Sequence, residues 1–177
     1  MTRYVALLRG INVGGVRIKM ADLAALFTDL GFGNVRTVLA SGNVLFDADD
    51  TAVDLKRSIE RALTDRFGYD AYVFVHPQSY LSAVADAYPF DEHVDGQHAY
   101  AVFVADESVL GELAALTDTL DPAVERIAVG DGVVYWEVEK GETIGSVFGK
   151  KIGASRFKAV TTNRNLRTVR KLCESPI

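Results

Sequence analysis

The side chains best suited to binding chemistry lie in two basic segments, one near each end of the chain. The first, residues 7–15, reads LLRGINVGG, so that an apolar run breaks into Arg9, Asn12 and three glycines before a helical pattern begins. Many proteins hold phosphate with a strand, a glycine-rich loop and a helix in this order, because the loop N–H groups converge on the anion. Arg17 and Lys19 add positive charge nearby. The segment predicts an anion-binding loop; a tight turn that needs glycine for positive φ is the alternative.

The glycine spacing differs from that of the loops that bind nucleoside triphosphates or dinucleotides. Gly10 and Gly15 are separated like the outer glycines of a phosphate loop, but Val16 and Arg17 stand where that motif requires lysine and a hydroxyl residue. The glycines at positions 10, 14 and 15 also do not form G-x-G-x-x-G. We therefore expect neither a nucleoside triphosphatase nor a dinucleotide enzyme.

The second basic segment, residues 161–172, reads TTNRNLRTVRKL. Its periodicity predicts a helix over residues 163–174 with Thr162 as the capping residue. The helix would carry an apolar stripe, which predicts that the thiol of Cys173 is buried against the core. The residues of that stripe are Leu166, Val169, Leu172 and Cys173.

The opposite face of this predicted helix is polar. Arg164, Thr168 and Lys171 are spaced i, i+4 and i+7, which places them on one side of a helix. A basic face beside a helix N-terminus combines the helix dipole with charged donors, and this combination suits phosphate or carboxylate groups. A solvated surface helix is the alternative interpretation.

Charge is distributed unevenly along the chain, whose net charge is −5. Residues 1–46 have a balance of +3, residues 47–142 a balance of −15, and residues 143–177 a balance of +7. Basic ends flanking an acidic middle indicate an anionic partner at the ends. We expect the loop of residues 7–15 and the last helix to form one basic site for that partner.

The order of predicted elements repeats. Residues 1–77 read as β-α-β-β-α-β, the order of a ferredoxin-like plait. A helix and a polar linker follow over residues 78–97, and the same order begins again over residues 98–177, with at most a weak final strand at residues 159–161. The predicted fold class is therefore α+β, with two tandem ferredoxin-like (alpha-beta plait) domains.

The segments YVALLRGINVGG, SGNVLF and TTNRNLRTVRKL resemble those of a family of uncharacterised bacterial proteins catalogued as domain of unknown function 1697. The resemblance implies two ferredoxin-like plaits and no established activity. It differs at Leu166, where the family commonly has tryptophan. Together with the loop glycines and Lys19, the polar positions of these motifs make up the candidate ligand-binding set. Its residues are Arg9, Asn12, Gly14, Gly15, Lys19, Ser41, Asn43, Arg164, Asn165, Thr168 and Lys171.

These features favour a binding module for a small anionic ligand, such as a nucleotide or a phosphorylated metabolite. RNA binding is the second hypothesis, although the expected third strand, residues 43–46, lacks the aromatic pattern of RNA-binding plaits. An enzyme acting on a phosphoryl or carboxyl group is the third, but no general base or catalytic residue is identifiable. His76, His93 and His98 lack metal-ligand spacing. The cofactor and the oligomeric state stay open, and the single cysteine and the lack of a leader or membrane pattern predict a cytoplasmic protein.

Overall fold

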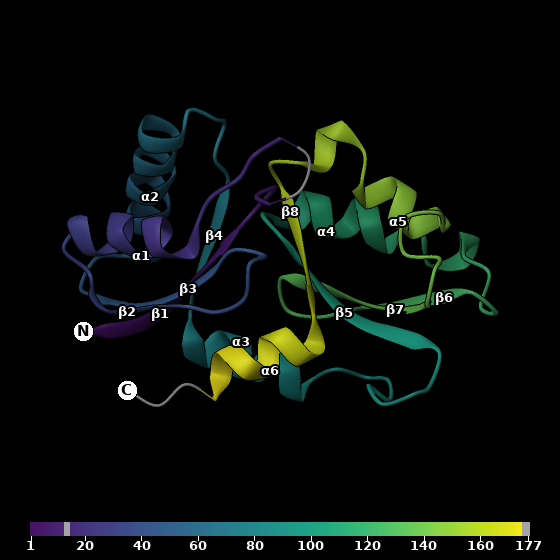
Figure 1. The fold of residues 1–177 in the computed structure, drawn as a ribbon. Helices are drawn as coiled ribbons and strands as arrows, with labels where there is room; N and C mark the ends of the chain where they lie inside the picture. The colour runs from purple at the N-terminus through teal and green to yellow at the C-terminus, as the bar shows by residue number, and fades with distance from the viewer. Residues whose placement is uncertain (13–14, 175–177) are drawn as a thin grey trace. The chain divides into compact units, whose positions relative to one another are not determined.

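The computed structural model describes residues 1–12 and 15–174. It contains two four-stranded antiparallel sheets, and the chain divides into two units (Figure 1). Unit 1 comprises residues 1–81 together with the end of the chain from Leu172, and unit 2 comprises Ser82–Lys171. The domain boundaries expected at residues 77 and 97 stay a prediction.

Unit 1 has the order β-α-β-β-α-β, and the chain then continues into helix α3 (Gln78–Asp86). Its sheet has the strand order β2-β3-β1-β4, so the first strand lies in the interior of the sheet. The elements are β1 (Thr2–Leu8), α1 (Met20–Asp29), β2 (Gly33–Thr37), β3 (Asn43–Ala48), α2 (Ala52–Phe67) and β4 (Val73–Pro77).

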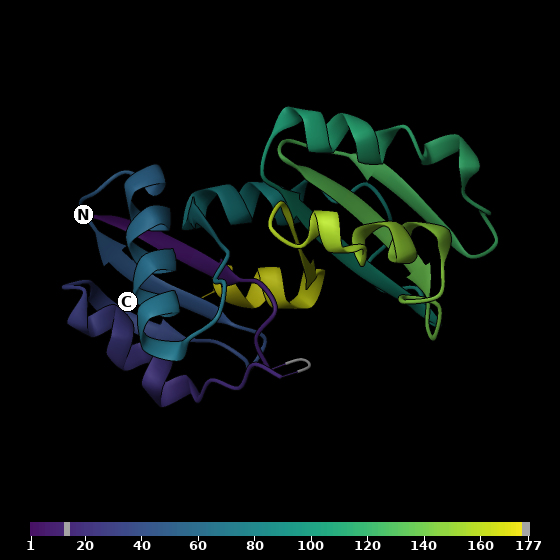
Figure 2. The ribbon, with the colours of Figure 1, turned by 90° about the horizontal axis from the view of Figure 1, so that it is seen from above.

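The core of unit 1 lies between its sheet and helices α1 and α2, which cover one face of the sheet (Figures 1 and 2). Alternate residues of β1 face these helices, as the period of two in a strand requires. An aromatic cluster around Phe46 fills the centre, with ring centroids 5.3 Å from Phe27 and 4.8 Å from Phe32. Helix α2 begins where expected, because the Thr51 hydroxyl accepts a hydrogen bond from the Asp54 N–H.

Unit 2 repeats this order, and its sheet has the matching strand order β6-β7-β5-β8. Two full sheets with the same topology confirm the predicted fold class of two ferredoxin-like domains. The elements are β5 (Gln97–Val104), α4 (Glu107–Ala114), η1 (Thr117–Thr119), β6 (Glu125–Val129), β7 (Val133–Glu139), α5 (Val147–Ile152), η2 (Ser155–Phe157), β8 (Thr161–Asn165) and α6 (Leu166–Cys173).

The core of unit 2 contains a buried carboxylate as well as apolar side chains. Glu125 is only 3% exposed and accepts hydrogen bonds from Trp136 Nε1 at 3.0 Å and from the Phe148 N–H at 3.3 Å. The second donor lies in the first turn of α5, where a negative charge is favoured by the helix dipole. On the other face of this sheet, the Tyr135 hydroxyl donates to the Val84 carbonyl at 2.7 Å.

The structure corrects the predicted start of the last helix. Residues 161–165 form the edge strand β8, which pairs with β5 from Val104 opposite Thr161 to Tyr100 opposite Asn165. The expected helix over residues 163–174 is therefore wrong at its first three positions, and Thr162 lies in a strand instead of capping a helix. Local periodicity favoured the helix, but this short polar segment forms a strand because it pairs with the neighbouring strand β5.

The structure also corrects the burial of Cys173. Leu166, Val169 and Leu172 are buried, as expected for the apolar stripe of α6. Cys173 is only half-buried, because it lies in the last turn at the edge of that stripe. The expectation of a fully buried thiol was wrong.

Candidate anion-binding site

In unit 1, the loop that follows β1 packs against the turn between β2 and β3. The Leu8 N–H donates to the Gly42 carbonyl at 2.8 Å, and Asn12 Nδ2 donates to the Ala40 carbonyl at 2.8 Å. Gly42 has φ +89°, and a Cβ there would lie only 2.8 Å from Cδ1 of Ile11. Close packing therefore holds together the two loops that carry the first group of predicted site residues.

The amides of two of these residues bind the loops themselves. Asn12, with φ +56°, also accepts from the Ile18 N–H at 3.0 Å. Asn43 Nδ2 donates to the Val38 carbonyl at 2.8 Å and to the Ser41 hydroxyl at 2.9 Å. These contacts set the shape of the loops, which is a role that a sequence pattern alone does not distinguish from ligand binding.

In the described part of the chain, one side-chain donor of Arg9 makes no hydrogen bond. Its guanidinium is half-buried, and the buried Nε has no hydrogen-bond partner in the described part of the chain. Burial lowers the pKa of Arg9 from its ordinary value. Gly15 and Lys19 are exposed, and Gly14 lies outside the described residues.

The second group of predicted residues lies in unit 2 and is divided between a strand and a helix. Arg164 is in β8 and only 7% exposed; its Nη1 donates to the Thr162 hydroxyl at 2.7 Å and to the Asn163 carbonyl at 2.9 Å. It therefore does not share a helical face with Thr168 and Lys171, which are in α6, and that expectation was wrong. The idea that both groups serve one ligand stays a prediction.

A pocket of about 380 Å³ lies at the start of α6 in unit 2. Three segments line it: residues 92–99, which enter β5; the residue that follows β7; and the junction of β8 with α6. Among the predicted site residues that the structure describes, Asn165 alone lines it. The same pocket is also lined by two lysine or arginine side chains and two histidines that are not in the predicted set: Lys140, Arg167, His93 and His98.

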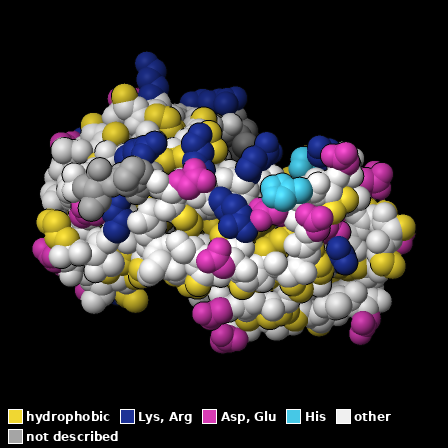
Figure 3. Space-filling model, turned by 90° about the horizontal axis from the view of Figure 1, so that it is seen from below, with side chains coloured by type: hydrophobic (Ala, Val, Ile, Leu, Met, Phe, Trp, Pro, Cys, Tyr) yellow, Lys and Arg dark blue, Asp and Glu magenta, His cyan; other side chains and the backbone are white. Residues whose placement is uncertain are grey.

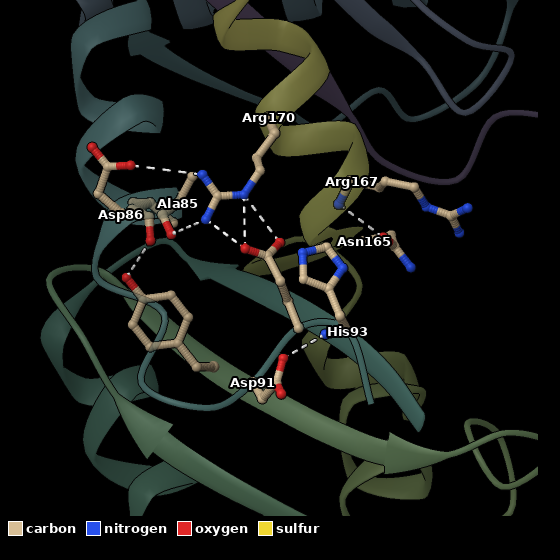
Figure 4. A network of polar contacts seen from close by, with 10 residues as sticks. Ala85, Asp86, Asp91, His93, Asn165, Arg167 and Arg170 are labelled. Carbon is tan, nitrogen blue, oxygen red and sulfur yellow. Dashed lines mark hydrogen bonds and ion pairs between the residues drawn. The ribbon is translucent and has the colours of Figure 1, made fainter. Parts of the chain in front are cut away.

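Backbone contacts position these side chains. Asn165 Oδ1 accepts from the Arg167 N–H at 2.9 Å, so Asn165 caps α6 and sets where Arg167 emerges (Figure 4). The Lys140 N–H donates to the Gly96 carbonyl at 2.9 Å, which joins the end of β7 to the turn before β5. The His93 N–H donates to Asp91 Oδ1 at 2.9 Å.

Most of the basic side chains of the pocket make no hydrogen bond or ion pair of their own, although His93 lies near Glu92 and, after Arg170, contributes to the lowered pKa of that carboxyl. Within residues 1–12 and 15–174, the side chains of His93, Lys140 and Arg167 make no hydrogen bond or ion pair, while His98 stacks against Tyr100 with ring centroids 5.5 Å apart. Histidine side chains lie next to both basic and acidic ones in the space-filling view of Figure 3. The acidic members are Asp95 and Glu92, and Glu92 already binds Arg170.

The basic side chains of the pocket are of the kind that can bind the oxygen atoms of an anion. Among the described residues, no three His, Cys, Asp or Glu side chains are placed to hold a metal ion. No described helix is long and apolar enough to cross a bilayer.

The two histidines of the pocket were visible in the sequence as HVDGQH, five residues apart around a turn. The lysine and arginine that complete the pocket come from distant segments.

By its fold, the chain is an α+β protein of two ferredoxin-like domains. It belongs to the family described as "Protein of unknown function (DUF1697)", whose model matches residues 1–135. That range includes the pocket segment from Glu92 to Ala99 and ends before Lys140.

Comparison with solved structures supports the same fold over nearly the whole chain. The conserved bacterial protein SP0830 from Streptococcus pneumoniae matches with a TM-score of 0.80 and 23% identity, covering 98% of this chain and 97% of that one. None of the curated proteins matches.

Proposed function

We propose that this protein is a binding module for a small anionic ligand, such as a nucleotide or a phosphorylated metabolite, and that the pocket at the start of α6 receives the anionic group. The observation that carries the proposal is that His93, Lys140 and Arg167 line one pocket while making no hydrogen bond or ion pair within the described chain. Lys140 and Arg167 are both cationic and repel one another in a shared pocket, so an anion bound there relieves that repulsion.

The chemistry of the lining matches a phosphate or carboxylate group. Arg167 presents a planar guanidinium that can bind two oxygens at once, and Lys140 contributes a point charge. Each charge-assisted hydrogen bond contributes about 1.5–3 kcal/mol, and the dipole of α6 adds roughly 0.3–1 kcal/mol at its N-terminus. The pocket volume of about 380 Å³ is at the lower end of small-molecule sites, so we expect a compact ligand.

Titration with inorganic phosphate and with a nucleoside monophosphate tests the proposal. We expect either probe to raise the melting temperature by mass action and added sodium chloride to reduce that rise. Arg167→Gln should remove most of it. Lys158→Gln is the matched control, because Lys158 is an exposed cation of the same unit that does not line the pocket.

Two results would contradict the proposal. One is the absence of any phosphate-dependent stabilisation in the wild-type protein at low ionic strength. The other is an Arg167→Gln variant that retains the full effect. Binding of single-stranded RNA with a steep dependence of log affinity on log salt would instead favour the RNA hypothesis, since the slope counts phosphate contacts.

A further inference from the structure

The pocket contains a carboxylate that would oppose anion binding if it were unpaired. Glu92 lines the pocket directly before His93. A carboxylate charge on the wall of a partly buried pocket repels a phosphate that enters it and so weakens phosphate binding. The pocket can therefore select anions only if the charge of Glu92 is compensated.

Arg170 of α6 provides this compensation. Its Nε donates to both carboxylate oxygens of Glu92, at 2.9 Å and 3.0 Å, and its Nη2 donates to Oε1 at 2.6 Å. These hydrogen bonds lower the pKa of Glu92 and raise that of Arg170, so both groups stay charged and paired. Both carboxylate oxygens of Glu92 therefore already accept hydrogen bonds from α6.

The same guanidinium anchors the chain that leads into the pocket. Its Nη2 donates to the Ala85 carbonyl at 3.2 Å, and its Nη1 lies 3.6 Å from Asp86 Oδ1 (Figure 4). Arg167 precedes Arg170 by three residues, so one side of α6 carries both the pocket cation and the anchor. A single helix thus sets the distance between Arg167 and the segment that bears His93.

We propose that Arg170 is the positioning residue that makes this pocket selective for anions, because it pairs with Glu92 and holds the His93 segment against α6. The inference rests on the proposed function. Arg170 acts through Glu92 and does not itself contact the ligand.

A double-mutant cycle on Arg170 and Glu92 tests this role, with the dissociation constant of inorganic phosphate as the readout. We expect Arg170→Gln to weaken phosphate binding about five- to tenfold, because the charge of Glu92 is released into the pocket. Glu92→Gln should bind phosphate at least as tightly as the wild type. In the double variant the second substitution should restore binding to within about threefold of the wild type, because the carboxylate that Arg170 compensates is gone.

The matched control is another arginine–glutamate pair of unit 2, between Arg156 and Glu112, which does not line the pocket. Arg156→Gln should leave the dissociation constant unchanged. Circular dichroism and the melting temperature of each variant establish that it is folded. Arg170→Lys keeps the charge with a smaller loss of hydrogen bonds, and it should fall between the wild type and Arg170→Gln.

The outcomes separate the two proposals. If the wild type does not bind phosphate, the proposed function is wrong and the role of Arg170 falls with it. If the wild type binds and Arg170→Gln binds equally well, the proposed function stands and the role of Arg170 is wrong. If the double variant binds as weakly as Arg170→Gln, Arg170 contacts the anion directly or serves the fold alone, and the inference is overturned.

Discussion

The two ferredoxin-like units share a topology but differ at equivalent corners of their sheets. At the N-terminal end of β1 in unit 1, Arg3 donates to the Asn34 carbonyl at 2.7 Å and to Asp47 at 3.1 Å. At the corresponding end of β5 in unit 2, the pocket is lined by His93, Lys140 and Arg167, whose side chains make no hydrogen bond or ion pair within the described residues. The corner of unit 1 is stabilised by its own hydrogen bonds, whereas that of unit 2 leaves side chains available for the anion that we propose.

At the opposite ends of the two sheets the contrast is reversed. There, among the described residues, unit 1 carries the polar group without a partner, and the polar group of unit 2 is hydrogen-bonded. In unit 1 the chain leaves β1 through a long loop that begins with the half-buried Arg9. In unit 2 the connection from β5 to α4 is two residues long and ends in the capping residue Asp106, whose carboxylate accepts from the Val109 N–H at 3.0 Å. The same fold thus carries its polar, uncompensated groups at different ends, which shows that connections rather than topology determine the candidate sites.

The largest expected effect concerns the buried carboxylate that the core of unit 2 contains, Glu125. Glu125→Ala should lower the free energy of unfolding by about 3 kcal/mol, because Trp136 Nε1 and the Phe148 N–H would be left buried without an acceptor. Urea denaturation followed by tryptophan fluorescence measures this loss. Glu125→Gln, which keeps an acceptor, should lose less; an equal loss would mean that the charge, and not the hydrogen bonds, stabilises unit 2.

The next prediction concerns the loops of unit 1. Gly42→Ala should destabilise the protein by about 2–3 kcal/mol, because the new Cβ meets Leu8 and Ile11 at φ +89°. Gly10→Ala is the control: it has φ +74° but nothing within 4 Å of the added carbon, so we expect only about 1 kcal/mol. Equal losses in thermal denaturation would show that packing between the two loops does not contribute.

The pH dependence of stability should reflect His76 of β4. Burial lowers the pKa of His76 to about 4. Between about pH 6.5 and pH 4 the unfolded chain therefore binds a proton that the folded chain does not, so stability falls as the pH falls, by roughly 2–3 kcal/mol in total. His76→Phe should show a shallower decline over this range in urea titrations. A variant with the same slope as the wild type would contradict the assignment to His76.

The smallest expected effect separates the two candidate sites. For a chain of this length, a stabilisation of about 1 kcal/mol raises the melting temperature by roughly 2–4 °C. If the pocket of unit 2 alone receives phosphate, Arg167→Ala removes this rise and Arg9→Ala leaves it in place. Loss of the rise in Arg9→Ala and Arg164→Ala, with Lys56→Ala unaffected, would instead support one site for both basic segments.

The fold could be predicted because its signals are local. Capping residues such as Thr51 and Asp106, the glycines that close turns, and apolar periodicity each act within a few residues, and the structure has the corresponding helices and hairpins at those places. The start of the last helix was missed for the converse reason. Residues 161–165 have no strong preference of their own, and their structure comes from pairing with β5.

By itself, the sequence determined the element order, the repeat of the β-α-β-β-α-β unit, the apolar faces and the family. Tertiary structure alone decided which polar groups are paired and which are not. Asn12, Asn43 and Arg164 look in the sequence like ligand-binding residues, but their side chains bond to their own loops and strand. The pocket depends instead on contacts between segments more than 70 residues apart, such as the pairing of Arg170 with Glu92. Whether a charge is compensated depends on distance in space, and no pattern along the chain encodes that distance.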